Sequence, residues 1–204
     1  MTKIKLSAVD VRAAMAHQSN DPSREILNGI LLAKNGDIVS SDGTSLFLAK
    51  GSMDEENKPT EDTVIKLGSA VPISTEWLEV DLDGTIVECW SNAKIKKRIP
   101  FQIVLGTFPD YEQVLPSEPG IDQPYNDTVY LTAKMLQKLA KTWGKDTTFK
   151  IKSNGVNCPL TVTSTEHNGL IVVMPCRVVK CNKSDRGHEL IRSDASVPLA
   201  RVVA

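Results

Sequence analysis

Four lysines recur at helical spacing near residue 140. Lys134, Lys138, Lys141 and Lys145 are separated by four, three and four residues, so they fall on one face of an α-helix. The opposite face, which we expect to pack on a sheet, carries Leu136, Leu139 and Trp143. A row of ammonium groups would contact the phosphates of duplex DNA without reading the bases, and this contact would weaken as salt rises. A solvated helix face is the alternative, but such faces usually mix both signs of charge and this segment has no acidic residue.

No group of residues in the sequence predicts a catalytic centre. Asp81 and Asp83 could together bind a cation, but they flank a turn and have no further ligand nearby. The serines and histidines form no recognisable pair of nucleophile and base, and no glycine-rich phosphate loop is present. The four cysteines, at positions 89, 158, 176 and 181, lack zinc-ligand spacing. We therefore expect a protein that is not an enzyme and that needs no metal or cofactor.

The composition limits where the protein works and how it would bind DNA. The formal net charge is −1, so any DNA contact has to come from a local face. Scattered thiols fit a reducing cytoplasm better than a disulfide framework. The first ten residues lack the apolar region of a signal peptide, and no apolar run could span a bilayer. We predict a cytoplasmic protein that does not associate with a membrane.

The segments that must position these residues are mostly antiparallel strands. Asn-Gly or Asp-Gly pairs favour the turns of β-hairpins, and each such pair here lies between apolar or alternating segments. The four predicted hairpin turns are Asn35-Gly36, Asp83-Gly84, Asn154-Gly155 and Asn168-Gly169. Two helices are predicted as well. The first runs from about Ala8 to Ser19 with Ser7 and Asp10 as a capping box, and the second from about Ala133 to Trp143 between Thr132 and Gly144.

The order of these elements predicts an internal duplication. A short strand, a helix and about three strands occur near residues 3–50, and the same order recurs near 128–178, with a predicted strand at Thr128–Leu131. Between them, residues 63–107 are rich in strands and contain no convincing helix. The fold class is therefore α+β. We expect one domain at residues 1–116, a linker at 117–126, a half-domain at 127–178 and a tail at 179–204.

Three further segments resemble a known family. They are REILNGILL at Arg24–Leu32 with SDGTSL at Ser41–Leu46, FPDYEQVLP at Phe108–Pro116, and VVMPCRV at Val172–Val178. Together and in this order they resemble the bacterial DNA polymerase III beta subunit, the sliding clamp. The resemblance covers about residues 3–178. It implies a clamp-like fold in a shortened member of the family, of phage or mobile-element type. On this resemblance we expect half of the last domain and the whole first domain of a clamp to be missing, and a helix near Gly68–Ser74 to be lost.

The resemblance also implies a pocket for short peptides of polymerases and other replication or repair proteins. Its walls would come from a set of positions matched to the clamp family. They are Leu27, Ser41, Gly43, Thr44, Leu46, Pro109, Val114, Val172, Val173, Met174, Pro175, Cys176 and Arg177. The chemistry is reasonable, since Met174 can adapt to different side chains and Gly43 lets a peptide approach the backbone. Arg177 could bind a carbonyl or carboxylate oxygen. The alternative is that Leu27, Val114 and Val173 are simply core residues.

Two other basic features belong to the same expectation. Arg24 matches a family position that approaches DNA. The cluster Lys94–Arg98 reads as an exposed strand whose charges discourage edge pairing, with DNA binding as the alternative. The sequence thus predicts a processivity or docking factor, and we expect a homo-oligomer. It would contact duplex DNA non-specifically through Arg24 and the four lysines and bind partner peptides. The rival hypothesis is a protein-interaction module, a decoy or adaptor, that keeps the peptide pocket without encircling DNA.

Overall fold

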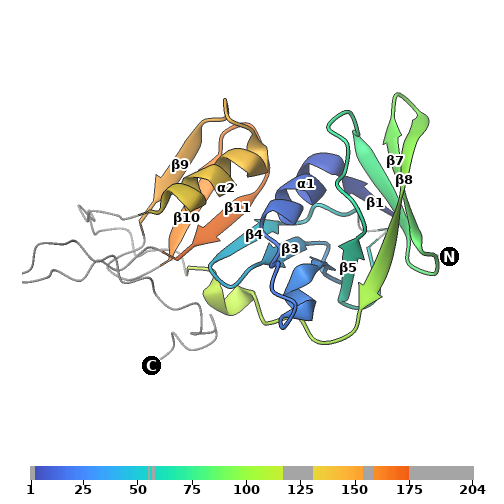
Figure 1. Ribbon diagram of the computed structural model, residues 1–204, viewed down its shortest axis with the longest axis horizontal. Coiled ribbons are helices and arrows are strands. Elements are labelled where there is room, and N and C mark those ends of the chain that lie inside the picture. The colour runs from blue at the N-terminus through green and yellow to red at the C-terminus, as the bar shows by residue number, and fades with distance from the viewer. Residues whose placement is uncertain (1–2, 55, 57, 117–130, 154–158, 175–204) are drawn as a thin grey trace, which may run out of the picture.

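The computed structural model describes residues 3–54, 56, 58–116, 131–153 and 159–174. Its strands form one antiparallel sheet, and both α-helices lie on the same face of it (Figure 1). The elements in chain order are β1 (Lys3–Ser7), α1 (Ala8–Ala16), η1 (Glu25–Asn28), β2 (Ile30–Leu32), β3 (Ile38–Ser41), β4 (Ser45–Ala49), β5 (Thr63–Leu67), β6 (Trp77–Asp81), β7 (Ile86–Ser91), β8 (Lys94–Val104), η2 (Glu112–Val114), α2 (Ala133–Trp143), β9 (Phe149–Lys152), β10 (Leu160–Ser164) and β11 (Leu170–Val173). No helix in these residues is long and apolar enough to cross a membrane.

The strand order across the sheet is β1-β6-β7-β8-β5-β2-β3-β4-β11-β10-β9. β4 pairs with β11, so the sheet runs without a break from the predicted first domain into the predicted half-domain. The division at residues 117–126 lies outside the described residues and stays a prediction. Three of the four predicted hairpins are confirmed, because β2 pairs with β3, β6 with β7 and β10 with β11. The turn Asn154-Gly155 lies outside the described residues, although its flanking strands β9 and β10 pair antiparallel.

The second helix begins and ends at the predicted residues. Thr132 caps its N-terminus by accepting a hydrogen bond from the Met135 N–H, and Gly144, with φ of +104°, ends it. Of the predicted strand Thr128–Leu131, only Leu131 is described, and it is not in a strand. The first helix is shorter than predicted: it stops at Ala16, and the next residue, His17, is its C-cap and is buried. Ser7 is its N-cap as predicted.

Apolar side chains fill both sides of the middle of the sheet. One core lies between the sheet and the two helices, and it contains Phe47 and Val173. The other lies on the opposite, outer face, where the segment after β8 covers β2, β3 and β4. β4 is therefore buried on both faces, which explains why its sequence, SLFLA, is nearly continuously apolar rather than alternating.

A loop, and not a helix, joins β5 to β6. No helix is present at residues 68–76, as predicted for the region 63–107. Arg12, on α1, holds this loop by donating hydrogen bonds to the carbonyl oxygens of Pro72 and Thr75, and Val71 is buried in the helix-side core. Arg12 is thus engaged in packing the loop against α1.

Candidate functional site

The outer face of the sheet brings together three of the segments that were predicted to form a pocket. Leu46 on β4, Val114 in η2 and Val172 on β11 belong to one buried apolar cluster. Leu46 and Val172 are cross-strand neighbours in the β4–β11 ladder. Ile26, Phe108 and Leu170 pack against the cluster and are only partly buried. These residues come from positions 26 to 172, so the fold itself, and not local sequence, creates this cluster.

The segment that covers the outer face is fixed at Tyr111. Its hydroxyl donates to the carboxylate of Asp37 over 3.0 Å and accepts from the side-chain amide of Asn35 over 2.9 Å. Burial raises the pKa of Tyr111 to about 12, so the hydroxyl keeps the proton that it donates. A surface cavity of about 460 Å³ lies beside it, lined in part by Leu48, Lys50, Tyr111 and Leu115. The outer cluster therefore borders a concave surface, as a peptide site requires.

The turn between β3 and β4 forms a second part of the predicted pocket. Asp42 organises it, because one carboxylate oxygen accepts hydrogen bonds from the backbone N–H groups of Thr44 and Ser45 and from the Thr44 hydroxyl, each over 2.9 Å. Gly43 has φ of +85°, a conformation that side chains disfavour. A Cβ atom at this position would also lie 2.8 Å from a guanidinium nitrogen of Arg24. Arg24 therefore lies against the pocket turn.

The remaining predicted pocket residues differ in their surroundings. Leu27 is partly buried in η1, Ser41 is buried in β3 with its hydroxyl bonded to the Ser45 carbonyl, and Pro109 is exposed. Val173 faces the helix-side core, on the other face of the sheet from Val172, so it does not line the outer cluster. Met174 is partly buried and its N–H donates to the Thr44 carbonyl over 3.1 Å. Pro175, Cys176 and Arg177 lie outside the described residues.

A buried polar network joins α2 to this turn. The ammonium group of Lys138 donates to the Asp42 carboxylate over 2.6 Å and to the Ser45 hydroxyl over 2.7 Å. His17 bridges the Ser45 hydroxyl, 2.9 Å from its Nδ1, and the Thr142 hydroxyl, 3.0 Å from its Nε2. Thr142 in turn donates to the backbone carbonyl of Lys138 over 2.9 Å. The chain of hydrogen bonds thus leaves α2 at Lys138 and returns to the same residue.

Burial and these contacts favour a neutral His17. Thr142 gives its proton to a carbonyl, so its oxygen can accept from an Nε2–H of His17. The Ser45 hydroxyl lies 2.9 Å from Nδ1 of His17 and 3.2 Å from the Asp42 carboxylate, and its one proton can go to either acceptor. Burial, and then the nearby charge of Lys138, lower the pKa of His17 to about 3. Burial would raise the pKa of Asp42, but Lys138 and the N–H groups of the turn lower it to about 2. Burial lowers the pKa of Lys138, and Asp42 offsets part of this effect.

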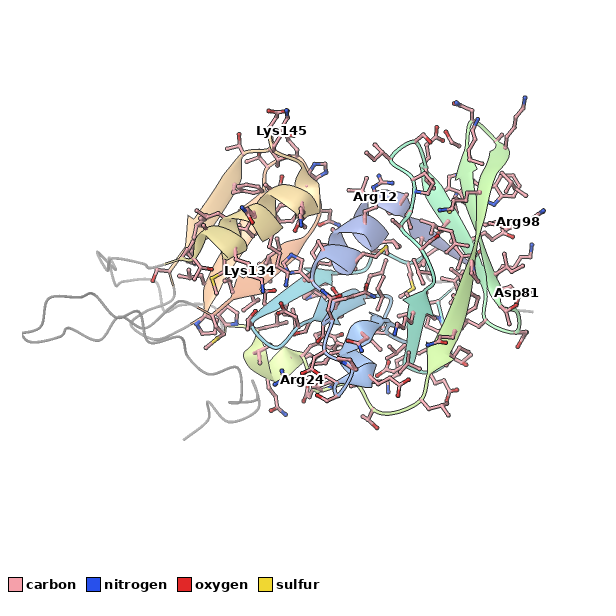
Figure 2. The ribbon with its side chains drawn as sticks, in the orientation of Figure 1. Arg12, Arg24, Asp81, Arg98, Lys134 and Lys145 are labelled. Atoms are coloured by element: carbon pink, nitrogen blue, oxygen red, sulfur yellow. The ribbon has the colours of Figure 1, made fainter. Side chains whose placement is uncertain are left out.

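The lysines of α2 do not all lie on an open face. Lys134, Lys141 and Lys145 are exposed, and Figure 2 shows Lys134 and Lys145 near the two ends of the helix. Lys138 differs from the prediction, since only 18% of its side chain is exposed and it is paired with Asp42. Leu136 was expected to pack on the sheet, but it is 51% exposed. The packing stripe is Met135, Leu139, Thr142 and Trp143, at the spacing of one helix face.

The other predicted basic residues lie elsewhere. Arg24 belongs with the β3–β4 turn and lies away from the α2 lysines (Figure 2). The cluster Lys94–Arg98 forms the exposed first half of β8, as expected. Within it, Arg98 pairs with Glu88 over 2.9 Å, and Lys97 donates to Ser69 and to the carbonyl of Ala70. The structure thus uses part of this cluster for local contacts.

The network contains a serine, a histidine, a lysine and an aspartate, which are residue types found in catalytic sites. Its geometry does not suit a nucleophile, because Ser45 is 4% exposed and His17 is fully buried. Asp81 accepts a hydrogen bond from the Asp83 N–H in the hairpin turn, which is the structural role considered for it. Within the described residues, no three metal-ligating side chains gather at one place. The buried network therefore serves to hold α2 against the β3–β4 turn.

Comparison with known proteins supports one conclusion about the fold. No protein-family model matches the sequence, and no curated protein matches it. Among solved structures, the Bacillus subtilis DNA polymerase sliding clamp is similar with a TM-score of 0.60 at 12% identity, over 87% of this chain and 64% of that one. The DNA polymerase III beta subunit of Borrelia burgdorferi gives a TM-score of 0.61 at 14% identity, over 88% and 65%. This chain has the sliding-clamp fold.

The C. crescentus beta sliding clamp gives the same result, with a TM-score of 0.59 at 14% identity over 87% of this chain. This chain spans less than two thirds of the length of the Bacillus and Borrelia clamps that it matches. The sliding-clamp fold with antiparallel sheet and two helices was predicted from the sequence and is confirmed. The sequence did not reveal the network of His17, Ser45 and Thr142. Its members are up to 125 residues apart, and no local pattern marks them.

Proposed function

We propose that this protein is a clamp-like docking factor of DNA replication, which contacts duplex DNA non-specifically and binds partner peptides on its outer face. The main support is the separation of two surfaces by one sheet of the sliding-clamp fold. The exposed lysines of α2 lie on the helix side, and the cluster of Leu46, Val114 and Val172 lies on the other side. A protein built this way could hold DNA and a partner at the same time. It would act by binding and not by catalysis.

That the chain is a shortened member of the clamp family, of phage or mobile-element type, stays a prediction. The cytoplasmic location and the homo-oligomer stay predictions. The mass in solution, measured by sedimentation equilibrium, tests the second of them.

Reversing the charge of the open lysines should weaken DNA binding. We expect the Lys134→Glu, Lys141→Glu, Lys145→Glu triple variant to bind duplex DNA at least about tenfold more weakly. The slope of log K against log salt should fall by roughly 2 to 3, since each phosphate contact contributes about 0.9. Lys138 is left intact, because a glutamate there would meet Asp42. Fluorescence anisotropy with a labelled duplex at several salt concentrations measures both quantities.

A matched control changes the same charge on the other face. Phe149 packs on Trp143 of α2, so its neighbours Lys150 and Lys152 point to the outer face of the sheet. The variant Lys50→Glu, Lys150→Glu, Lys152→Glu should lose much less affinity than the α2 variant. Equal losses in the two variants would mean that net charge, and not the helix face, governs DNA binding. If the salt slope of the α2 variant is unchanged, the α2 lysines do not contact DNA phosphates and the proposed DNA binding is wrong.

The peptide site is tested at Met174. We expect Met174→Lys to lower the affinity for a clamp-type peptide, a glutamine followed by leucine and an aromatic residue, by about tenfold, because it puts a charge at the edge of an apolar site. Isothermal titration calorimetry with wild type and with Thr165→Lys, an exposed position just after β10, provides the comparison. If all three proteins bind equally, or none binds, the peptide assignment is wrong.

One observation favours the rival function, an adaptor that keeps the pocket without encircling DNA. Lys138 is withdrawn into the network with Asp42, so the helix face offers three open lysines instead of four. Peptide binding together with no salt-dependent DNA binding would establish the adaptor. The two experiments above therefore separate the two functions.

A further inference from the structure

Among the described residues, the strand β9 is the last of the sheet, beneath α2, and no described strand pairs with its second edge. It pairs with β10 on one side and is last in the strand order of the described residues (Figure 1). An edge strand presents backbone N–H and C=O groups that another extended chain can pair with. We propose that this edge takes up an extended segment of a different protein, in which acidic and apolar residues alternate. The inference depends on the sheet alone and holds whether or not the protein binds DNA.

The two faces of β9 specify the chemistry of the added strand. Lys150 and Lys152 are exposed on the outer face, opposite Thr163 and Thr161 of β10, and neither is in an ion pair among the described residues. Residues directly across a strand pair interact, and opposite charges there are stabilising. A strand paired with this edge would therefore place its outer side chains beside two ammonium groups that no described carboxylate pairs with, which favours aspartate or glutamate.

The helix side of the same edge is apolar and incompletely covered. Phe149 packs on Trp143, with ring centroids 5.8 Å apart, but Ile151 is 45% exposed. Leu136 is half-exposed on α2, about 200° around the helix from Lys138. Since Lys138 points toward the β3–β4 turn, Leu136 lies on the flank of α2 away from that turn. Apolar side chains of an added strand would cover Ile151 and approach this flank.

The described strands of a second copy do not fit this edge. The other end of the sheet is β1, whose outward residues are Lys3 and Lys5. Pairing β9 with β1 or with another β9 would set lysines across from lysines, which is destabilising. An alternative is that the lysines only prevent this edge from pairing with other chains. Exposed apolar side chains such as Ile151 and Leu136 would not be expected on an edge with that role alone. Charge and exposed apolar area together favour an acidic partner strand.

The test uses a synthetic peptide as the probe. An eight-residue peptide of alternating glutamate and valine, fluorescently labelled, is titrated with the full chain and followed by anisotropy. We expect saturable binding, and no comparable binding by the lysine–valine peptide. The variant Lys150→Glu, Lys152→Glu should reverse this preference, with each affinity changing by about tenfold. The matched variant Lys134→Glu, Lys141→Glu carries the same charge change on the exposed face of α2 and should keep the wild-type preference.

A second pair of measurements separates strand pairing from simple attraction of charges. The glutamate–valine peptide with alternate backbone nitrogens methylated keeps its charge but cannot pair, so it should not bind. If it binds as well as the parent peptide, or if the parent peptide does not bind, the proposal is wrong. In the absence of peptide, the mass of the protein in solution should be the same for wild type and for Ile151→Asp. A lower mass for Ile151→Asp would mean that a second copy occupies the edge, and the proposal would be wrong.

Discussion

Lowering the pH from about 7.5 to about 5 should reduce the free energy of unfolding by about 2 kcal/mol, because of one histidine. His17 is fully buried, and its pKa in the folded protein is lowered to about 3, chiefly by burial. In the unfolded chain the pKa returns to about 6.5. Between these values the unfolded state binds one proton more than the folded state. Stability is therefore highest above about pH 6.5 and is lost as the pH falls toward about 3.

The expected loss at pH 5 depends almost entirely on the unfolded state. His17 is unprotonated in the folded protein at that pH, because its pKa of about 3 lies well below pH 5. Urea unfolding followed by tryptophan fluorescence, repeated across this pH range, measures the effect. The control is His17→Asn, which replaces the imidazole with a side-chain amide that can form hydrogen bonds but does not titrate. This variant should be less stable at pH 7.5, and its stability should change by about 2 kcal/mol less than that of wild type between the two pH values. Parallel pH profiles would contradict the assignment.

The hairpins show what the sequence alone could predict. Asn35-Gly36, Asp83-Gly84 and Asn168-Gly169 each lie between the two strands that the structure pairs, because these turns depend on local backbone preferences. The helix α2 was also predicted within its observed bounds, since Thr132 and Gly144 carry local capping signals. Features that depend on a few adjacent residues could thus be read directly.

Predictions that needed a partner from another element were less secure. Spacing placed Lys138 on a helix face, but spacing could not show that Asp42, 96 residues away, takes up its charge. Leu136 was assigned to the packing side, although the buried stripe is centred on Leu139 and Thr142. Tertiary packing decides which part of a helix surface is covered, and a spacing argument alone leaves some rotation of the helix open.

One difference at the pocket could have been found from the sequence. Val172 and Val173 are adjacent residues of a strand, and adjacent side chains point to opposite faces. Both could not line a pocket on one face, and the structure puts Val173 in the helix-side core. The position of Arg24 against Gly43 could not be found in this way, because it depends on the loop between α1 and β2. The alternation of side chains along a strand therefore shows that Val172 and Val173 cannot line the same face, a point that the family resemblance alone did not show.

Replacing Asp42 with alanine should destabilise the protein by about 3 kcal/mol, because it leaves a mostly buried ammonium group without its counter-ion. Two backbone N–H groups of the turn would lose their acceptor as well. Urea unfolding gives the free energy, and Asp81→Ala is the control. Asp81 also accepts a backbone hydrogen bond in a turn, but the Asp81–Asp83 bond is solvent-exposed, so the control should lose less than about 1 kcal/mol.

A double-mutant cycle separates the ion pair from the turn. Lys138→Met removes the charge and keeps most of the side chain's apolar length, so Asp42→Ala should cost about 1–2 kcal/mol less in that background. The rest of the loss belongs to the turn that carries Gly43 and Thr44. If the two substitutions are additive, Lys138 and Asp42 do not stabilise each other, and Lys138 is free to contact phosphate as the helix spacing first indicated. A large coupling means that α2 and the β3–β4 turn form one unit, so a ligand that displaces the Lys138 ammonium group would loosen the proposed peptide site on the other side of the sheet.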